Sequence, residues 1–372
     1  MNIGLDVNPL FTGHRFRGIG FYTKNLCHYL INSEGGHSYH LYRSFGNPDS
    51  MVPGNVDLYT LGGEKDALCR SALENGLDVL HITDYYHPVY TLSGLEELKK
   101  HGVKLVVSVA DTIPLRFPEI YPSEKQFMEK NLTPLLSLAN YIIAISRATV
   151  DDFIRFFSLP PSRFAVTHLG YNPEFCSPGT LETDVLALKK YGICLPFFLY
   201  VGGFDWRKNC ETTLRAFKAL LWQHPQCYQM VFVGNDPPTP VMREAMADIT
   251  QSLVFTGFIP EMELAALYRR AIALVFPSRY EGFGLPVLEA MACGTPVISS
   301  DRGSLPEIVE NGGLLLDPKR PDLWTEAMKS LIFRPALAQA LRERGLARAQ
   351  KFSWDRCARE TLDVYLSCIY LK

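Results

Sequence analysis

The sequence predicts an α/β protein built from two doubly wound domains. The chain has 372 residues, and a typical domain size of about 150 residues gives a starting expectation of roughly 2.5 domains. Short apolar runs of strand length alternate with helical patterns up to residue 167, and the same alternation starts again at residue 197. Apolar strands separated by helices are typical of a mostly parallel sheet that is buried on both faces.

The first series begins with a strand at residues 2–7, a loop that contains glycine, and a helix at residues 19–31. Further strands are expected at residues 40–42, 79–82, 104–109, 141–145 and 164–167, and helices at residues 94–101, 123–138 and 147–157. The second series has strands at residues 197–201, 230–233, 253–255, 273–276, 296–299 and 313–316, and its first helix spans residues 210–224. Residues 172–196 carry several prolines and glycines, so the domain boundary is expected there.

The composition excludes several classes of protein. Apolar residues make up 47% and charged residues 20% of the chain, as in an ordinary globular protein. The net charge of −2 gives no electrostatic reason to expect a nucleic-acid partner. No apolar stretch approaches the ~18 residues of a membrane span, and the N-terminal segment does not look like a signal peptide.

Cysteine and carboxylate spacing gives no sign of a metal or disulfide framework. The nine cysteines are scattered and no pair has Cys-x-x-Cys spacing, which favours reduced cysteines in a cytosolic protein. The chain contains no Asp-x-Asp sequence and no His/Cys cluster with the spacing of metal ligands. We therefore expect neither a metal nor another resident cofactor.

Residues 276–300, FPSRYEGFGLPVLEAMACGTPVISS, carry the strongest chemical signal. A predicted strand is followed by Gly282 and Gly284, which allow close approach of the backbone to a ligand, and Pro286 suits the first turn of a helix. A helix N-terminus at this point is a natural phosphate site. Glu281 and Glu289, eight positions apart, could contact different parts of one extended ligand; the alternative is a glycine-rich turn with solvated carboxylates.

A second constellation lies at residues 202–209, GGFDWRKN, between a predicted strand and a helix. Arg207 and Lys208 place fixed positive charge at this turn. A diphosphate leaving group needs such charge because it becomes more negative as its bond breaks. The alternative is a solvated basic turn.

The segment EGFGLPVLEAMACGTPV resembles the signature of the retaining glycosyltransferases of family 4, which have the GT-B fold. The segments VFTGFIPEMELAALYRRA and DRGSLPEIVENGGLLLDP on either side are similar to the same family, so that the resemblance is specific over about residues 197–320. It implies two Rossmann-like domains that face a central cleft, an acceptor-side domain at residues 1–172 and a donor domain at residues 173–352. It also implies a crossover helix at residues 353–372 that packs back on the first domain.

The resemblance implies a role for each motif residue of the second domain. Glu281 would bind hydroxyls of the donor sugar, Glu289 the ribose hydroxyls, and Arg207 and Lys208 the diphosphate. Backbone groups would hold the sugar, phosphates and base, at Gly202, Gly203, Phe258, Ile259, Gly282, Phe283, Gly284 and Leu285. Many family members have arginine where this chain has Gly203, so the diphosphate would depend more on the basic pair.

The N-terminal half resembles the family less closely. RGIGFYTKNL at residues 17–26 is similar to the family's first glycine loop, where Gly18 and Gly20 would approach donor or acceptor. VVSVADTIPLRFPEIYP resembles a segment that usually carries His-Asp, but this chain has alanine before Asp111, which stays a candidate catalytic residue.

Three residues of HITDYYHP, which follow another predicted strand, are candidates for the acceptor side: His81, Asp84 and Tyr85. For His81 a purely structural role is the alternative. Arg15 and Arg17 could touch a membrane or an anionic acceptor, although a flexible acceptor loop is the simpler interpretation.

The resemblance implies a retaining, metal-independent hexosyltransferase, with mannose from GDP-mannose as the best match for the donor. The acceptor would be a saccharide or lipid-linked saccharide in lipopolysaccharide O-antigen or exopolysaccharide synthesis. A cytoplasmic location is expected, with peripheral contact with the inner membrane as an option. The alternatives are a UDP- or dTDP-sugar donor, a nucleotide-sugar epimerase of the same fold, and a non-catalytic carbohydrate-binding subunit.

Overall fold

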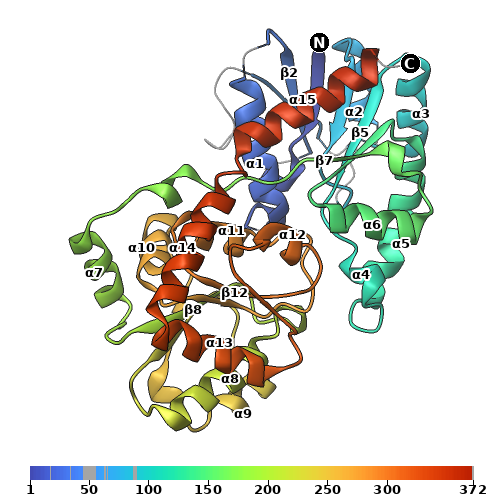
Figure 1. Ribbon diagram of the computed structural model, residues 1–372. Helices are drawn as coiled ribbons and strands as arrows, with labels where there is room; N and C mark the ends of the chain where they lie inside the picture. Colours follow the sequence, from blue (N-terminus) through green and yellow to red (C-terminus); the bar gives the residue numbers. More distant parts are fainter. Residues whose placement is uncertain are drawn as a thin grey trace. The chain divides into compact units, whose positions relative to one another are not determined.

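The computed structural model describes residues 1–16, 18–33, 35–44, 56–62, 64, 66–86 and 90–370. Contacts within the chain divide it into two compact units (Figure 1). Unit 1 comprises Met1–Gly170 and Ser353–Lys372, and unit 2 comprises Tyr171–Phe352. The chain thus passes from one unit to the other at residues 170/171 and 352/353. The boundaries expected from the sequence are 172/173 and 352/353.

Unit 1 contains a seven-stranded sheet in the order β3-β2-β1-β4-β5-β6-β7. Every pairing is parallel, for example Ile3 with Tyr39 and Val79 with Lys104. The strands are β1 (Asn2–Asp6), β2 (Ser38–Arg43), β3 (Asp57–Thr60), β4 (Val79–Ile82), β5 (Lys104–Val109), β6 (Tyr141–Ala144) and β7 (Phe164–Val166). All four residues of β4 are buried, as expected for a strand covered on both faces.

The helices of unit 1 include one from the far end of the chain. They are α1 (Gly18–Ile31), α2 (Ala67–Glu74), α3 (Leu92–Lys100), α4 (Ile113–Arg116), α5 (Pro122–Leu138), α6 (Arg147–Phe157) and α15 (Trp354–Tyr370). Figure 1 shows α15, in red, beside α1, in blue, and the two helices pack together. Cys357, Thr361 and Tyr365 of α15 are each four residues apart, so they lie on one face of the helix, and all three are buried.

Unit 2 contains a six-stranded parallel sheet in the order β10-β9-β8-β11-β12-β13. Its strands are β8 (Phe197–Val201), β9 (Gln229–Val233), β10 (Leu253–Gly257), β11 (Leu274–Phe276), β12 (Val297–Ser300) and β13 (Leu314–Leu316). Its helices are α7 (Leu181–Lys190), α8 (Cys210–Gln223), α9 (Pro240–Met246), α10 (Glu261–Arg270), α11 (Leu285–Ala292), α12 (Leu305–Val309), α13 (Pro321–Phe333) and α14 (Pro335–Ala349).

Two parallel sheets with helical crossovers confirm the predicted fold class. The sequence patterns miss β3 because it is an edge strand whose four residues are only exposed or half-buried, so it has no apolar run. The expected boundary segment contains α7, which the side chain of Thr180 caps by accepting a hydrogen bond from the backbone of Thr183. No helix within the described ranges is both long and apolar enough to span a membrane.

The strand order locates the ligand crevice that each sheet can offer. In open α/β sheets, ligands bind beyond the carboxyl ends of the strands, where the order reverses. In unit 1 this reversal lies between β1 and β4, and in unit 2 it lies between β8 and β11. The loops after β8 and β11 are those that carry the two motifs of the second domain.

Candidate active site

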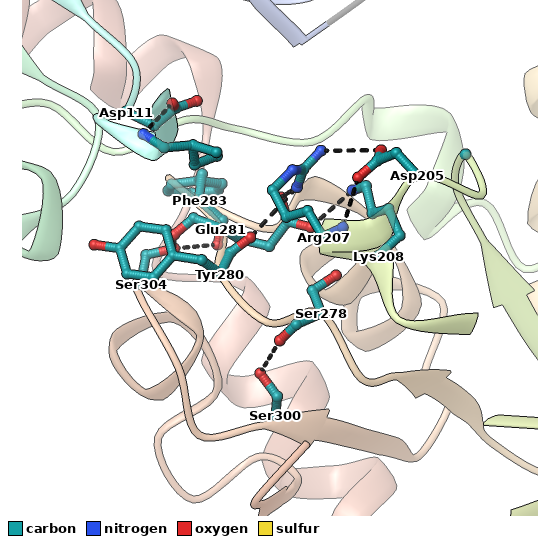
Figure 2. Close-up of polar contacts among 12 residues, drawn as sticks. Asp111, Asp205, Arg207, Lys208, Ser278, Tyr280, Glu281, Phe283, Ser300 and Ser304 are labelled. Atoms are coloured by element: carbon teal, nitrogen blue, oxygen red, sulfur yellow. Dashed lines mark hydrogen bonds and ion pairs between the residues drawn. The ribbon is translucent and has the colours of Figure 1, made fainter. Parts of the chain in front are cut away.

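An ion triad lies at the carboxyl ends of β8 and β11 (Figure 2). Arg207 and Lys208 belong to the short 3₁₀ turn Trp206–Lys208 that follows β8, and Glu281 belongs to the loop that follows β11. Nη1 of Arg207 is 2.7 Å from Oε2 of Glu281, and Nζ of Lys208 is 2.7 Å from Oε1. The structure therefore brings together three of the predicted site residues from two separate motifs.

The basic turn is held in place by its neighbours. The side chain of Asp205 accepts a hydrogen bond from the backbone N–H of Arg207 at 2.9 Å. Asn209, buried and with φ of 56°, donates through Nδ2 to the carbonyl oxygens of Pro277 and Pro318, both at 3.0 Å. Asn209 was missed by the sequence reasoning, although its position directly after the basic pair is a signal that a turn residue is needed there.

Charge and burial act against each other in the triad. Burial alone would raise the pKa of Glu281, but the positive charges of Arg207 and Lys208 outweigh it and lower this pKa to about 2. Burial lowers the pKa of Lys208, and the charge of Glu281 only partly opposes that effect. The ammonium group of Lys208 also lies 5.1 Å from the ring centroid of Phe276, a cation–π contact. Glu281 is therefore ionised throughout the physiological pH range.

The loop that carries Glu281 is anchored by residues that the sequence reasoning did not single out. Oγ of Ser304 donates to the carbonyl oxygens of Glu281 at 3.0 Å and Phe283 at 2.8 Å (Figure 2). Gly303 has φ of 60°, and a Cβ atom there would lie 2.5 Å from the carbonyl oxygen of Glu281. The close approach of the two backbones requires glycine at residue 303.

The glycine motif continues directly into a helix. Gly284, with φ of 103°, is the N-cap of α11, which starts at Leu285 with a proline in its first turn. The positive end of the helix dipole therefore lies next to Gly282 and Phe283. This is the arrangement in which a helix N-terminus can bind a phosphate group.

Glu289 lies on the same helix and has different surroundings. Its Oε2 accepts a hydrogen bond from the hydroxyl group of Tyr268 on α10, at 3.0 Å. Burial raises the pKa of Glu289 to about 7, and the hydrogen bond from Tyr268 opposes this rise. The two glutamates of the motif are thus set apart by their environments, one firmly ionised and one that titrates near neutral pH.

The remaining predicted donor contacts lie on neighbouring loops of unit 2. Gly202 follows β8, and a Cβ atom on Gly203 would lie 2.5 Å from Oδ2 of Asp236, so a carboxylate occupies the space beside this glycine. After β10, the backbone N–H of Phe258 donates to Oδ1 of Asn235 at 2.6 Å. Phe258 is 72% exposed, whereas Ile259 is buried.

The predicted site residues of the N-terminal half belong to unit 1. Asp111 follows β5, and its carboxylate accepts a hydrogen bond from the backbone N–H of Ile113 at 3.0 Å. Gly18 starts α1, and no atom would contact a Cβ atom placed there. A Cβ atom on Gly20 would lie 2.5 Å from the carbonyl oxygen of His14, so packing within unit 1 is sufficient to explain this glycine. Arg17 lies outside the described residues.

The three residues predicted for the acceptor side are buried in unit 1. His81 is fully buried, with Nδ1 2.6 Å from the hydroxyl oxygen of Tyr365 and Nε2 2.7 Å from Oγ of Ser108. Burial lowers the pKa of His81 to about 3, so its ring is neutral. Asp84 is also fully buried, and Tyr85 is buried in the core of unit 1. The packing of unit 1 is sufficient to explain the burial of these side chains, and their role on the acceptor side stays a prediction.

Within the ranges that the structure covers, no group of three or more His, Cys, Asp and Glu residues is placed to hold a metal ion. Arg207 and Lys208, which pair with Glu281, and the N-terminus of α11 supply positive charge at the candidate site.

Comparison with known proteins identifies two family matches along the chain. Residues 194–348 match the model of glycosyl transferases group 1, and residues 16–175 match that of glycosyltransferase family 4. The O-antigen chain mannosyltransferase B of Escherichia coli is 32% identical over 253 residues, which cover 67% of this chain and 66% of that protein. The serotype-specific mannosyltransferase WbdA of E. coli is 30% identical over 268 residues, 70% of this chain but only 33% of WbdA.

Solved structures share the fold over the whole chain. Anabaena HepE, crystallised in a complex with UDP-glucose, superposes with a TM-score of 0.73 at 17% identity, covering 99% of this chain and 100% of HepE. This likeness concerns the fold alone, and it agrees with the predicted GT-B class.

Proposed function

The chain belongs to the glycosyltransferases described by the group 1 and family 4 models, and from this premise we propose that it is a retaining hexosyltransferase. We infer that it moves mannose from GDP-mannose to a saccharide or lipid-linked saccharide acceptor. The observation that carries the proposal is the triad of Arg207, Lys208 and Glu281 beside the N-terminus of α11. The relatives named as O-antigen mannosyltransferases favour mannose and a role in O-antigen or exopolysaccharide synthesis.

The basic pair supports departure of a nucleoside diphosphate. As the bond between the anomeric carbon and the diphosphate oxygen breaks, negative charge accumulates on the leaving group. Arg207 and Lys208 lie in the turn after β8 and the N-terminus of α11 follows the loop after β11, and in this proposal all three stabilise this charge. In this proposal the two fixed cations do the work that a divalent metal would do, and the reaction needs no metal.

The state of Glu281 favours binding over covalent chemistry. A carboxylate with a pKa of about 2 that bridges two cations is a weak base and a weak nucleophile. It is well suited to accept hydrogen bonds from sugar hydroxyl groups. In the same-face mechanism that follows, the acceptor oxygen bonds to the anomeric carbon as the diphosphate leaves, and the departing phosphate takes the acceptor proton. Configuration at the anomeric carbon is retained.

Glu289 completes the proposed donor site. Its carboxylate lies on α11, one to two helical turns beyond the proposed phosphate position, where ribose hydroxyl groups could donate to it. The exposed loop around Phe258 lies at the end of β10, next to β9, and would border the base. The HepE complex with UDP-glucose keeps a UDP-sugar donor as the second candidate.

Isothermal titration calorimetry with GDP-, UDP-, dTDP- and ADP-sugars would identify the donor. We expect GDP-mannose to bind, and transfer to an oligosaccharide acceptor to give a product with the donor's anomeric configuration by NMR. If a UDP-sugar binds and GDP-mannose does not, the donor is the UDP-sugar. Rapid conversion of the donor without an acceptor would favour an epimerase. Failure of every nucleotide sugar to bind would refute the proposal.

A matched pair of lysine variants tests the site assignment. Replacement of Lys208 by alanine removes one of the two cations that face the leaving group, and we expect kcat to fall by about 10²–10³-fold. Lys329→Ala is the control, because Lys329 pairs with Glu326 on α13, at 2.8 Å, away from the loops after β8 and β11. Equal turnover in the two variants would contradict the assigned role of Lys208.

A further inference from the structure

The two cations of the candidate site are already neutralised by carboxylates of the same site. Glu281 uses one oxygen for Arg207 and the other for Lys208, both at 2.7 Å, and Asp205 lies 3.7 Å from the guanidinium group of Arg207. The formal charges of these four side chains add up to zero. A nucleoside diphosphate that approaches them therefore meets no excess positive charge from this cluster.

Resting on the function proposed above, we propose that Glu281 makes the site discriminate between the intact nucleotide-sugar donor and the spent nucleoside diphosphate. Phosphate oxygens and the Glu281 carboxylate compete for the same N–H donors of Arg207 and Lys208. A bound donor offers sugar hydroxyl groups to the carboxylate in exchange, whereas the spent nucleotide offers none. Glu281 therefore stabilises the donor complex and destabilises the product complex.

Burial makes this competition costly. The side chains of Glu281, Lys208 and Arg207 are only 10%, 13% and 18% exposed, so water cannot replace a lost partner freely. A buried charge that loses its partner is strongly destabilised, while one that gains new hydrogen bonds is not. When the nucleoside diphosphate binds without a sugar, the Glu281 carboxylate loses its cation partners and gains none. When the nucleotide sugar binds, the sugar hydroxyl groups replace those partners and offset the loss.

The peptide group that carries the carboxylate is held in place, so Glu281 can leave the cations only by rotation of its own side chain. The backbone carbonyl of Glu281 accepts hydrogen bonds from the N–H of Ser304 at 3.1 Å and from its Oγ at 3.0 Å, and Gly303 packs against the same peptide. While Glu281 pairs with both cations, their charge lowers the pKa of its carboxyl group to about 2. After transfer, the sugar hydroxyl groups leave, and Glu281 regains Arg207 and Lys208 as the diphosphate departs.

Calorimetric titration of the full chain with GDP, GDP-mannose and inorganic pyrophosphate tests the proposal, with UDP and UDP-glucose run in parallel. In Glu281→Gln the carboxamide no longer neutralises the cations, so we expect GDP and pyrophosphate to bind about tenfold more tightly than in the wild type. The same variant should gain nothing for GDP-mannose. The ratio of the two dissociation constants would then shift toward the product by about tenfold or more.

Glu289→Gln is the matched control on the same motif, because Glu289 pairs with the hydroxyl group of Tyr268, whereas Glu281 pairs with two cations. We expect it to weaken GDP and GDP-mannose to the same extent and to leave pyrophosphate affinity unchanged. Unchanged or weaker binding of GDP and pyrophosphate by Glu281→Gln would refute the proposal that Glu281 discriminates against the spent nucleotide, even if donors bind normally. If no nucleotide or nucleotide sugar binds the wild type, the proposed function fails instead.

A second variant covers the case in which Glu281→Gln does not fold. Glu281→Asp keeps the charge but is one methylene shorter, so its carboxylate cannot hold both cations at the wild-type distances. We expect GDP and pyrophosphate affinities several-fold above those of the wild type. Equal affinities in a folded Glu281→Asp protein would overturn the proposal.

Discussion

Replacement of Glu289 by glutamine should remove a pH dependence of stability that the fold imposes. Burial raises the pKa of Glu289 from 4.5 to about 7, so the folded protein holds a proton that the unfolded chain releases between these values. Folding stability from this group is therefore present at low pH and is lost as the pH rises through the folded pKa. The difference between these two pKa values corresponds to about 3 kcal/mol in the free energy of unfolding.

The measurement is urea unfolding of the wild type and Glu289→Gln at pH 5, 6, 7 and 8. Tryptophan fluorescence reports mainly on unit 2, because Trp206, Trp222 and Trp324 lie there and only Trp354 lies in unit 1. Other titrating groups cancel in the difference between the two proteins. We expect this difference to move in favour of the variant by about 2–3 kcal/mol between pH 5 and pH 8.

A surface variant provides the control for this measurement. Glu326 lies on α13 of the same unit with a side chain that is 66% exposed, so Glu326→Gln should follow the pH profile of the wild type. If the profiles of Glu289→Gln and the wild type run parallel from pH 5 to pH 8, the carboxyl group is not held protonated by its surroundings. Burial would then not be what sets the protonation state of Glu289.

Three further expectations concern the loop anchor, the crossover helix and the ribose site. Gly303→Ala should lower the free energy of unfolding by about 1–3 kcal/mol and reduce transfer, because the added methyl group collides with the loop that carries Glu281. Gly192 has a similar positive φ of 69°, but a Cβ atom there would lie in open space, so Gly192→Ala should lower the free energy of unfolding by only about 1–2 kcal/mol and leave kcat unchanged. Equal kcat values for the two variants would contradict the proposed anchoring of the Glu281 loop by Gly303. Tyr365→Phe removes the 2.6 Å partner of His81 and should lower stability by about 1–3 kcal/mol in thermal unfolding. The dissociation constant for the donor should not change, and a large change there would restore a site role for His81. Finally, GDP should bind more tightly to the wild type at pH 8 than at pH 6, because the proposed ribose hydroxyl groups donate hydrogen bonds to the ionised form of Glu289. Calorimetry should find no such pH dependence in Glu289→Gln, and a pH dependence of equal size in this variant would exclude Glu289 as its source.

Local patterns in the sequence were sufficient to predict most of the two sheets. Strands such as β5 and β8 are apolar runs bounded by turn residues, and their limits follow from the residues themselves. The same holds for the start of α11, where Gly284 and Pro286 signal the turn and the first helical residues. An edge strand such as β3, half exposed, carries no comparable signal, because its pattern depends on which neighbour covers it.

The sequence by itself determined which residues carry charge at the candidate site, since Arg207, Lys208 and Glu281 each stand in a turn whose residue types have a chemical meaning. Only the tertiary structure decided that one carboxylate bridges both cations, because β8 and β11 become neighbours through the sheet order and not through their separation along the chain. It also decided that His81 is covered rather than exposed. Its partner Tyr365 lies 284 residues away on α15, and burial of a polar side chain depends on what packs against it, which no local pattern encodes.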